Sequence, residues 1–155
     1  MTRLQRFLLS LLLFCAASQA LADDYAVYTS ESGFADVMDG LELAIQQRGM
    51  FINNVMHMNE MLERTGADLD LGDTLFDQAD SIEFCSAVLS RKMISEDPRR
   101  IVNCPFIIAV YTLPGEPETT YVAHRQIPSA ETDASPAMQE VATMLEEIAK
   151  EAISW

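Results

Sequence analysis

Hydrophobic and polar positions along the chain form a pattern that predicts five strands and four helices. Residues 25–30 form the first expected strand, and a helix follows between Gly33 and Gly49. Apolar residues recur in this helix at spacings of three and four, which places them on one buried face. They are Phe34, Val37, Met38, Leu41, Ala44 and Ile45. The pattern therefore opens with a strand and an amphipathic helix.

The middle of the chain is predicted to hold two strands and two helices. Residues 50–56 are rich in apolar side chains and are expected to form a strand, after which Asn59 can cap a short helix that stops at Gly66. Residues 67–80 are expected to form an acidic loop. Residues 82–84 are a strand candidate that leads into a helix from Ser86 to about Ser95.

The second half of the chain predicts a β-hairpin. Residue Asp97 precedes a proline, which disfavours helix and stops the preceding segment. Residues 106–113 form a strongly apolar strand, residues 114–117 a turn, and residues 119–125 the returning strand. In that strand Thr120, Val122 and His124 share one face, because side chains alternate across a strand. A hairpin implies antiparallel pairing.

The last predicted element is an amphipathic helix. Residues 126–134 are expected to be a polar linker, after which Ser135 is suited to the N-cap position and Pro136 to the first helical position. The buried stripe of this helix should contain Met138, Val141, Leu145, Ile148 and Ala152. Together the elements predict an α+β fold: a mainly antiparallel sheet with helices packed on one face.

The first 22 residues have the pattern of a cleaved signal peptide. Basic Arg3 and Arg6 precede an apolar run, and small residues end at Ala22. The run is too short to span the bilayer, so we expect no membrane anchor after cleavage. Cys15 should leave with the leader. We expect a periplasmic or secreted protein with three parts: a signal peptide at 1–22, an α+β domain at 23–134 and a C-terminal helix at 135–155 packed on it.

Composition narrows the possible partners. The chain has 10 Lys and Arg residues against 24 Asp and Glu, a formal charge of −14. Nucleic acid and anionic membranes need basic side chains to neutralise them, so neither is expected as a partner. Such a negative charge would attract a basic protein and speed its association with this chain.

Two cysteines, Cys85 and Cys104, remain in the mature chain. In an oxidising compartment a disulfide between them is the favoured prediction, and it would contribute about 3 kcal/mol on the chain-entropy view. A reactive thiol pair is the alternative, although the Cys-x-x-Cys spacing is absent. Two free, buried thiols are the third possibility.

Several dispersed motifs carry a family resemblance. They are Gly33-Phe34, Arg48-Gly49-Met50, Phe84-Cys85-Ser86-Ala87, Asp97-Pro98 and the run from Cys104 to Tyr111. With the order of elements, they resemble the bacterial domain-of-unknown-function family 302 (DUF302) over residues 25–127, in an exported branch with two cysteines. The resemblance implies a compact, often dimeric α+β domain with an arrangement like that of the TATA-binding protein. It implies no reaction.

The segment around His57 is the most suggestive candidate for ligand binding. Thioether and imidazole groups of His57, Met58 and Met61 suit copper or haem iron, and a helix starting near Met56 would put His57 and Met61 one turn apart. We therefore consider His57 and Met61 as metal ligands. The simpler interpretation is that the methionines fill the core.

His124 is the second candidate contact, and it would complete a two-histidine site if the fold places residues 50–56 beside it. Otherwise it is an edge residue with a satisfied ring. The acidic run from Asp68 lacks the glycine and glutamate positions of a calcium loop, which favours a solvated loop. Arg99 and Arg100 could bind an anion together, or they could simply be charged residues that keep an exposed turn in water.

These observations support two main hypotheses for function. The first is an exported small binding module of unknown ligand, with haem or a soft metal at the Met/His cluster as one possibility. The second is a non-catalytic, dimeric accessory subunit that docks a redox protein or enzyme through its acidic surface. A thiol redox enzyme using Cys85 is a third hypothesis. Nucleophile-elbow, phosphate-loop and dinucleotide motifs are absent, so the sequence favours a protein without catalysis.

Overall fold

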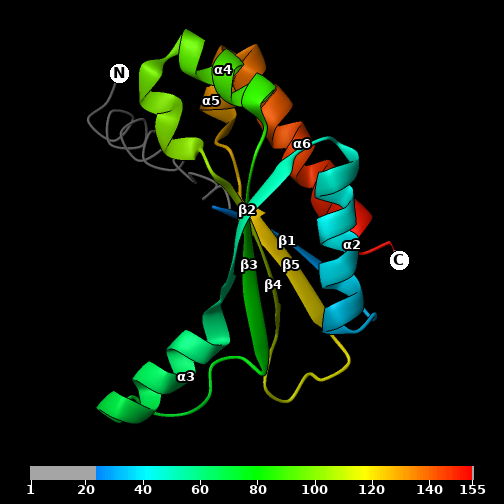
Figure 1. Ribbon diagram of the computed structural model, residues 1–155, viewed down its shortest axis with the longest axis vertical. Coiled ribbons are helices and arrows are strands. Elements are labelled where there is room, and N and C mark those ends of the chain that lie inside the picture. The colour runs from blue at the N-terminus through cyan, green and yellow to red at the C-terminus, as the bar shows by residue number, and fades with distance from the viewer. Residues whose placement is uncertain (1–23, 155) are drawn as a thin grey trace, which may run out of the picture.

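The computed structural model describes residues 24–154, and Figure 1 shows its arrangement. The predicted signal peptide, with Cys15, lies outside the described residues. Among the residues described, no helix is both long and apolar enough to cross a membrane.

A five-stranded antiparallel sheet forms the centre of the fold. Its strands are β1 (Tyr25–Ser30), β2 (Phe51–His57), β3 (Gln78–Cys85), β4 (Phe106–Thr112) and β5 (Thr120–Arg125). Their order across the sheet is β1-β5-β4-β3-β2, and each pair is antiparallel. This confirms the predicted α+β class and the predicted hairpin, which is β4 and β5.

Helices α2 (Phe34–Gln47) and α6 (Pro136–Ala152) lie on the same side of the sheet (Figure 1). Both predicted stripes are buried, including Leu41 and Ile45 of α2 and Met138 and Ile148 of α6. They contact the inward side chains of the central strands. Burial of these apolar surfaces supplies most of the folding free energy, at about 25 cal/mol per Å² removed from water.

The hairpin shows the alternation that the sequence predicts. Val110 of β4 stands opposite Val122 of β5, and both are fully buried. Thr120 and His124 share the inward face with Val122 and are also buried. Because the period of a strand is two, the intervening residues point to the other side of the sheet.

That other side is not covered by a helix in the described part of the chain (Figure 1). We call it the open face and define it by Tyr25, Val27, Ile107, Tyr111 and Tyr121. The first three are at least half exposed. The Tyr111 and Tyr121 rings stack with their centroids 5.0 Å apart. An exposed apolar, aromatic face of this kind commonly marks an interaction site.

Two boundaries differ from the sequence prediction. Helix α3 (Met58–Leu69) continues past Gly66, and Asp70 ends it in the left-handed conformation with φ 52°. Strand β3 begins at Gln78, inside the segment expected to be an acidic loop, so the loop is shorter than predicted. The reason is pairing: β2 and β4 flank β3, and the Gln78 backbone N–H donates to Thr112 Oγ1 at 3.1 Å.

Two short helices were not anticipated. Helix α5 (Ser129–Ala134) occupies the expected polar linker. The 3-10 helix η2 (Pro98–Asn103) follows α4 (Ala87–Glu96), and the Asp97 carboxylate caps it by accepting the Arg99 N–H at 3.0 Å. Arg99 also pairs with Asp97, and these contacts lower the Asp97 pKa to about 2.

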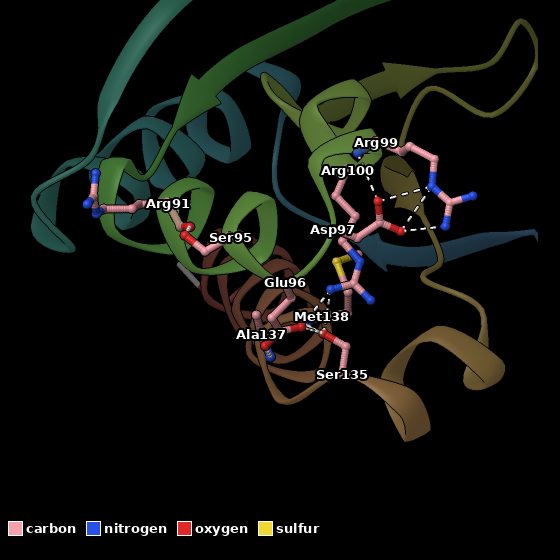
Figure 2. Close-up of polar contacts among 9 residues, drawn as sticks. All are labelled: Arg91, Ser95, Glu96, Asp97, Arg99, Arg100, Ser135, Ala137 and Met138. Carbon is pink, nitrogen blue, oxygen red and sulfur yellow. Dashed lines mark hydrogen bonds and ion pairs between the residues drawn. The ribbon is translucent and has the colours of Figure 1, made fainter.

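A polar cluster joins α4 to the start of α6 (Figure 2). Ser135 is fully buried and accepts the Met138 N–H at 3.1 Å, which confirms it as the N-cap. Its hydroxyl donates to the Glu96 carboxylate, which also pairs with Arg100 at 2.6 Å. The hydrogen bond from Ser135, more than the contact with Arg100, lowers the Glu96 pKa. One buried hydroxyl therefore links the two helices.

Replacing Ser135→Ala should lower the free energy of unfolding by about 1–2 kcal/mol, because it removes the α6 cap and leaves Glu96 without its hydroxyl partner. Urea unfolding followed by circular dichroism measures the change. Ser95→Ala is the matched control: its hydroxyl bonds the Arg91 carbonyl on an exposed face, so the change should stay within about 0.5 kcal/mol. Equal effects of the two variants would contradict the proposed link.

Candidate functional site

A cavity of about 330 Å³ lies between the β1–β5 edge of the sheet and helices α5 and α6. Ala26 and Tyr28 of β1 and His124 of β5 form one wall. The opposite wall is polar and is supplied by α5, α6 and the segment before them. Its polar members are Gln126, Ser129, Thr132, Gln139 and Glu146. We call this cavity the His124 pocket, and its volume is in the range of small-molecule sites.

The local chain path explains why the pocket forms. Ala26 pairs with His124 across the β1–β5 ladder, and the Gln126 N–H continues the ladder by donating to the Asp24 carbonyl at 2.9 Å. The chain then turns at Pro128 into α5, which stands beside the first turns of α6. Side chains of α5 and α6 therefore face the end of β5 across a gap that no large apolar residue fills.

His124 is the most unusual residue of the pocket. It is 7% exposed, and its ring stacks on Tyr28 with a centroid distance of 5.9 Å. The Nδ1 atom lies 3.0 Å from the Arg125 carbonyl, which can only accept, so Nδ1 carries the proton in the neutral ring. The buried Nε2 atom then offers a lone pair, and no described residue donates to it. A buried acceptor without a donor costs about 1–3 kcal/mol.

Neighbouring groups shift the pKa values of two residues that line the pocket, Glu146 and Tyr28. The hydrogen bond from Lys150, followed by the charge of Lys150, lowers the Glu146 pKa. Burial raises the Tyr28 pKa, and the Glu146 carboxylate raises it further. The pocket therefore presents an ionised carboxylate and a protonated phenol beside the His124 ring. This set can hold a polar molecule by hydrogen bonds.

His57 lies elsewhere. It is the last residue of β2 and precedes α3, so it is not inside a helix with Met61 as the sequence suggested. Its Nδ1 is 3.0 Å from the Asp80 carboxylate, and its side chain is 59% exposed. Strands β3 and β4 separate β2 from β5, three strand spacings or about 14 Å. The two histidines therefore cannot share one site.

Met58 and Met61 are on α3, which projects from the sheet at the end of β2 (Figure 1). No residue of α3 is buried, so these methionines do not fill the core, contrary to the simpler sequence interpretation. Nor do the described residues contain a group of three or more His, Cys, Asp or Glu side chains able to hold a metal.

Cys85 and Cys104 are brought together, with their sulfur atoms 2.7 Å apart. Asn53 donates to the Cys85 sulfur at 3.2 Å. Burial, together with the neighbouring Cys104, raises the Cys85 pKa. Arg99 and Arg100 are both paired with acidic side chains, Asp97 and Glu96, which favours their role in a turn over that of an anion clamp.

Sequence reasoning identified His124 but missed its partners. Glu146 lies outside the apolar stripe predicted for the last helix, and Tyr28 belongs to a short strand with no motif of its own. These residues are more than 100 positions apart in the sequence and meet through the β1–β5 pairing and the packing of α6. No local motif could signal such an assembly.

The His57–Asp80 contact makes a direct prediction. Its hydrogen bond, followed by the charge of Asp80, should hold the His57 pKa above the ordinary value of 6.5. Asp80→Asn removes the charge, so the pKa should return toward 6.5. Following the ring proton resonances of His57 against pH measures both values. Asp77→Asn, which removes a nearby charge that His57 does not contact, should leave the midpoint unchanged; an unchanged midpoint in Asp80→Asn would disprove the assignment.

Comparisons with known proteins agree on one family. The family model "Domain of unknown function DUF302" matches residues 26–152, which takes in α6 as well as the part in which the sequence resemblance was seen. The crystal structure of an uncharacterized conserved DUF302 protein from Bacillus stearothermophilus superposes with a TM-score of 0.64 at 19% identity, over 85% of this chain and 97% of that one. No curated protein matches the sequence. On the extent of the family match, the chain belongs to the DUF302 family.

Proposed function

We propose that the protein is a small-ligand-binding module whose ligand occupies the His124 pocket. The observation that supports this most is the His124 Nε2 atom, a buried acceptor with no donor among the described residues. Buried polar atoms in folded proteins are nearly always satisfied. A donor group on a bound molecule, in a cavity of about 330 Å³, would satisfy this one.

The charges of the pocket indicate the class of ligand. Nε2 calls for an N–H or O–H donor, and the Glu146 carboxylate, which pairs with Lys150, is a second acceptor on the pocket wall. Two glutamine amides and two hydroxyls add further hydrogen-bonding groups. We therefore propose a small amine or a polyhydroxylated molecule, and not a carboxylate or phosphate. No reaction is proposed, because no activated nucleophile lies among the residues that line the pocket.

The haem or copper hypothesis at His57 and Met61 has weaker support. Both side chains are more than one third exposed, and α3 buries none of its residues. A haem or soft-metal site usually excludes water around its ligands. The pocket around His124 meets that condition better than the exposed cluster does.

We also propose that the mature protein begins at Asp23 and functions in the periplasm or outside the cell. The basic and apolar pattern of residues 1–22 supports this, as does the presence of two cysteines in contact. We likewise propose that the protein belongs to an exported, two-cysteine branch of the family and that its arrangement is like that of the TATA-binding protein.

Mass measurement tests ligand binding directly. The full chain is expressed with its leader, and the mass of the recovered protein is measured by mass spectrometry under native and denaturing conditions. A native mass larger than that of the bare chain or chains identifies a retained ligand by the difference. Ala142→Phe places a ring in the pocket and should abolish the extra mass, whereas Ala87→Phe on the exposed start of α4 should keep it.

Proton NMR offers a second measurement. The chain contains two histidines, so the ring signals of each can be followed separately. Ethanolamine and glycerol should shift the His124 ring signals and leave those of His57 in place, whereas glycolate should shift neither. Ala142→Phe should remove the His124 shifts. A bare native mass together with unmoved His124 signals would contradict a binding role for this pocket.

A second candidate function is a dimeric accessory subunit. The open face favours it, since an uncovered sheet face with exposed Tyr25, Val27 and Ile107 would be costly in water. Copies of a chain with a charge of −14 repel one another, and the open face, with its apolar and aromatic residues, is the surface on which they could meet at least electrostatic cost. The acidic remainder would then be free to dock a basic redox protein or enzyme.

The dimer hypothesis predicts a sedimentation-equilibrium mass twice that of one chain. Val27→Glu puts charge on the open face and should return the protein to single chains. Val88→Glu makes the same change at an exposed position on α4 and should leave the dimer intact. A wild-type protein that sediments as a single chain would exclude this hypothesis.

A further inference from the structure

We propose that Cys85 and Cys104 are a dithiol–disulfide couple whose oxidation locks the α4–η2 segment to the sheet. The two sulfur atoms lie 2.7 Å apart, inside the van der Waals contact distance of two unbonded sulfurs. This distance puts the side chains in position to bond without a rotation of the backbone. The inference stands apart from the His124 pocket and does not depend on any ligand there.

The positions of the cysteines explain what the bond would hold. Cys85 ends β3, and Cys104 stands two residues before β4, where Phe84 pairs with Phe106. The bond would therefore close residues 86–103, which comprise α4 and η2, into a loop. The two ends of that loop join β3 and β4, which are already paired with each other in the sheet. Closure would restrict the segment and leave the sheet as it is.

The reaction is a thiol–disulfide exchange. The co-reactant is a disulfide, either a small molecule or an oxidising protein of the exported compartment. One cysteine thiolate attacks this disulfide and forms a mixed disulfide, releasing one thiol of the co-reactant; the second cysteine then displaces the other thiol. Two S–H bonds of the protein are lost and one S–S bond forms. The co-reactant gains the two electrons and two protons as two thiols.

The environment of the sulfurs favours a stable bond over a catalytic one. A catalytic thiol needs a low pKa, whereas burial raises that of Cys85. Ser86, and not Cys85, caps α4 by accepting the Leu89 N–H at 3.3 Å. Both cysteines are partly buried, which limits attack on the closed bond. The third sequence hypothesis, an enzyme using Cys85 as a nucleophile, therefore has little support.

The locked segment also holds the last helix. Glu96 and Arg100, which bind Ser135 at the start of α6, both lie between the two cysteines. Oxidation would fix the segment that carries these contacts, so the packing of α6 should become more resistant to unfolding. The couple thus links the redox state of the surroundings to the stability of the helical layer.

Thiol counting by mass tests the couple. The full chain carrying Cys15→Ser, which leaves two cysteines whether or not the leader is removed, is incubated with oxidised glutathione. We expect a product two hydrogens lighter, with no glutathione attached. Cys85→Ser and Cys104→Ser each leave one thiol and should instead acquire one glutathione. A protein that keeps both thiols, or that retains glutathione on the two-cysteine chain, would overturn the proposal.

Unfolding in urea tests the lock. With the bond closed, the equilibrium constant for unfolding should fall about 100-fold relative to the reduced protein, from the lost entropy of the unfolded loop. The Cys85→Ser variant should unfold alike under oxidising and reducing conditions, and this comparison holds even if the substitution lowers stability overall. Equal unfolding of the oxidised and reduced two-cysteine protein would show that the bond, if formed, locks nothing.

Discussion

Burial of one side of the sheet beneath α2 and α6 is the constraint on which the other features depend. Each helix has a single apolar stripe, and the two stripes together are wide enough to cover the central strands on one side. The connections α3 and α4 lie beyond the ends of the strands (Figure 1). Nothing in the described chain is left to cover the second side, so the open face follows from the number of helices and their amphipathic pattern.

The same constraint places the His124 pocket. Apolar residues fill the space between sheet and helices as far as Val122, but the next inward residue of β5 is His124. Near this edge of the sheet the helix layer presents Gln139 and Glu146 of α6 and the polar residues of α5. The core thus ends in a polar cavity at the β1–β5 edge, where a ligand can supply the hydrogen bonds that the protein does not make internally.

The elements whose patterns depend on near neighbours were predictable from the sequence. The α6 stripe from Met138 to Ala152, its Ser135 cap and the β4–β5 hairpin are of this kind, and all are present. The start of β3 was missed because Asp80 has poor strand propensity and is held in the strand by β2 on one side and β4 on the other. The pocket was missed because Tyr28 and Glu146 become neighbours only after the sheet has formed.

The pairing of β1 with β5 sets the order in which the chain can fold. Tyr25 is opposite Arg125, so the first strand has no partner until almost the whole domain has left the ribosome. Long-range antiparallel pairing of this kind closes a large loop and is slow. The hairpin β4–β5 and the helices between the strands can form earlier from local contacts. Strand β1 should therefore stay unpaired until β5 is available, and we expect it to join the sheet after the more local β4–β5 hairpin.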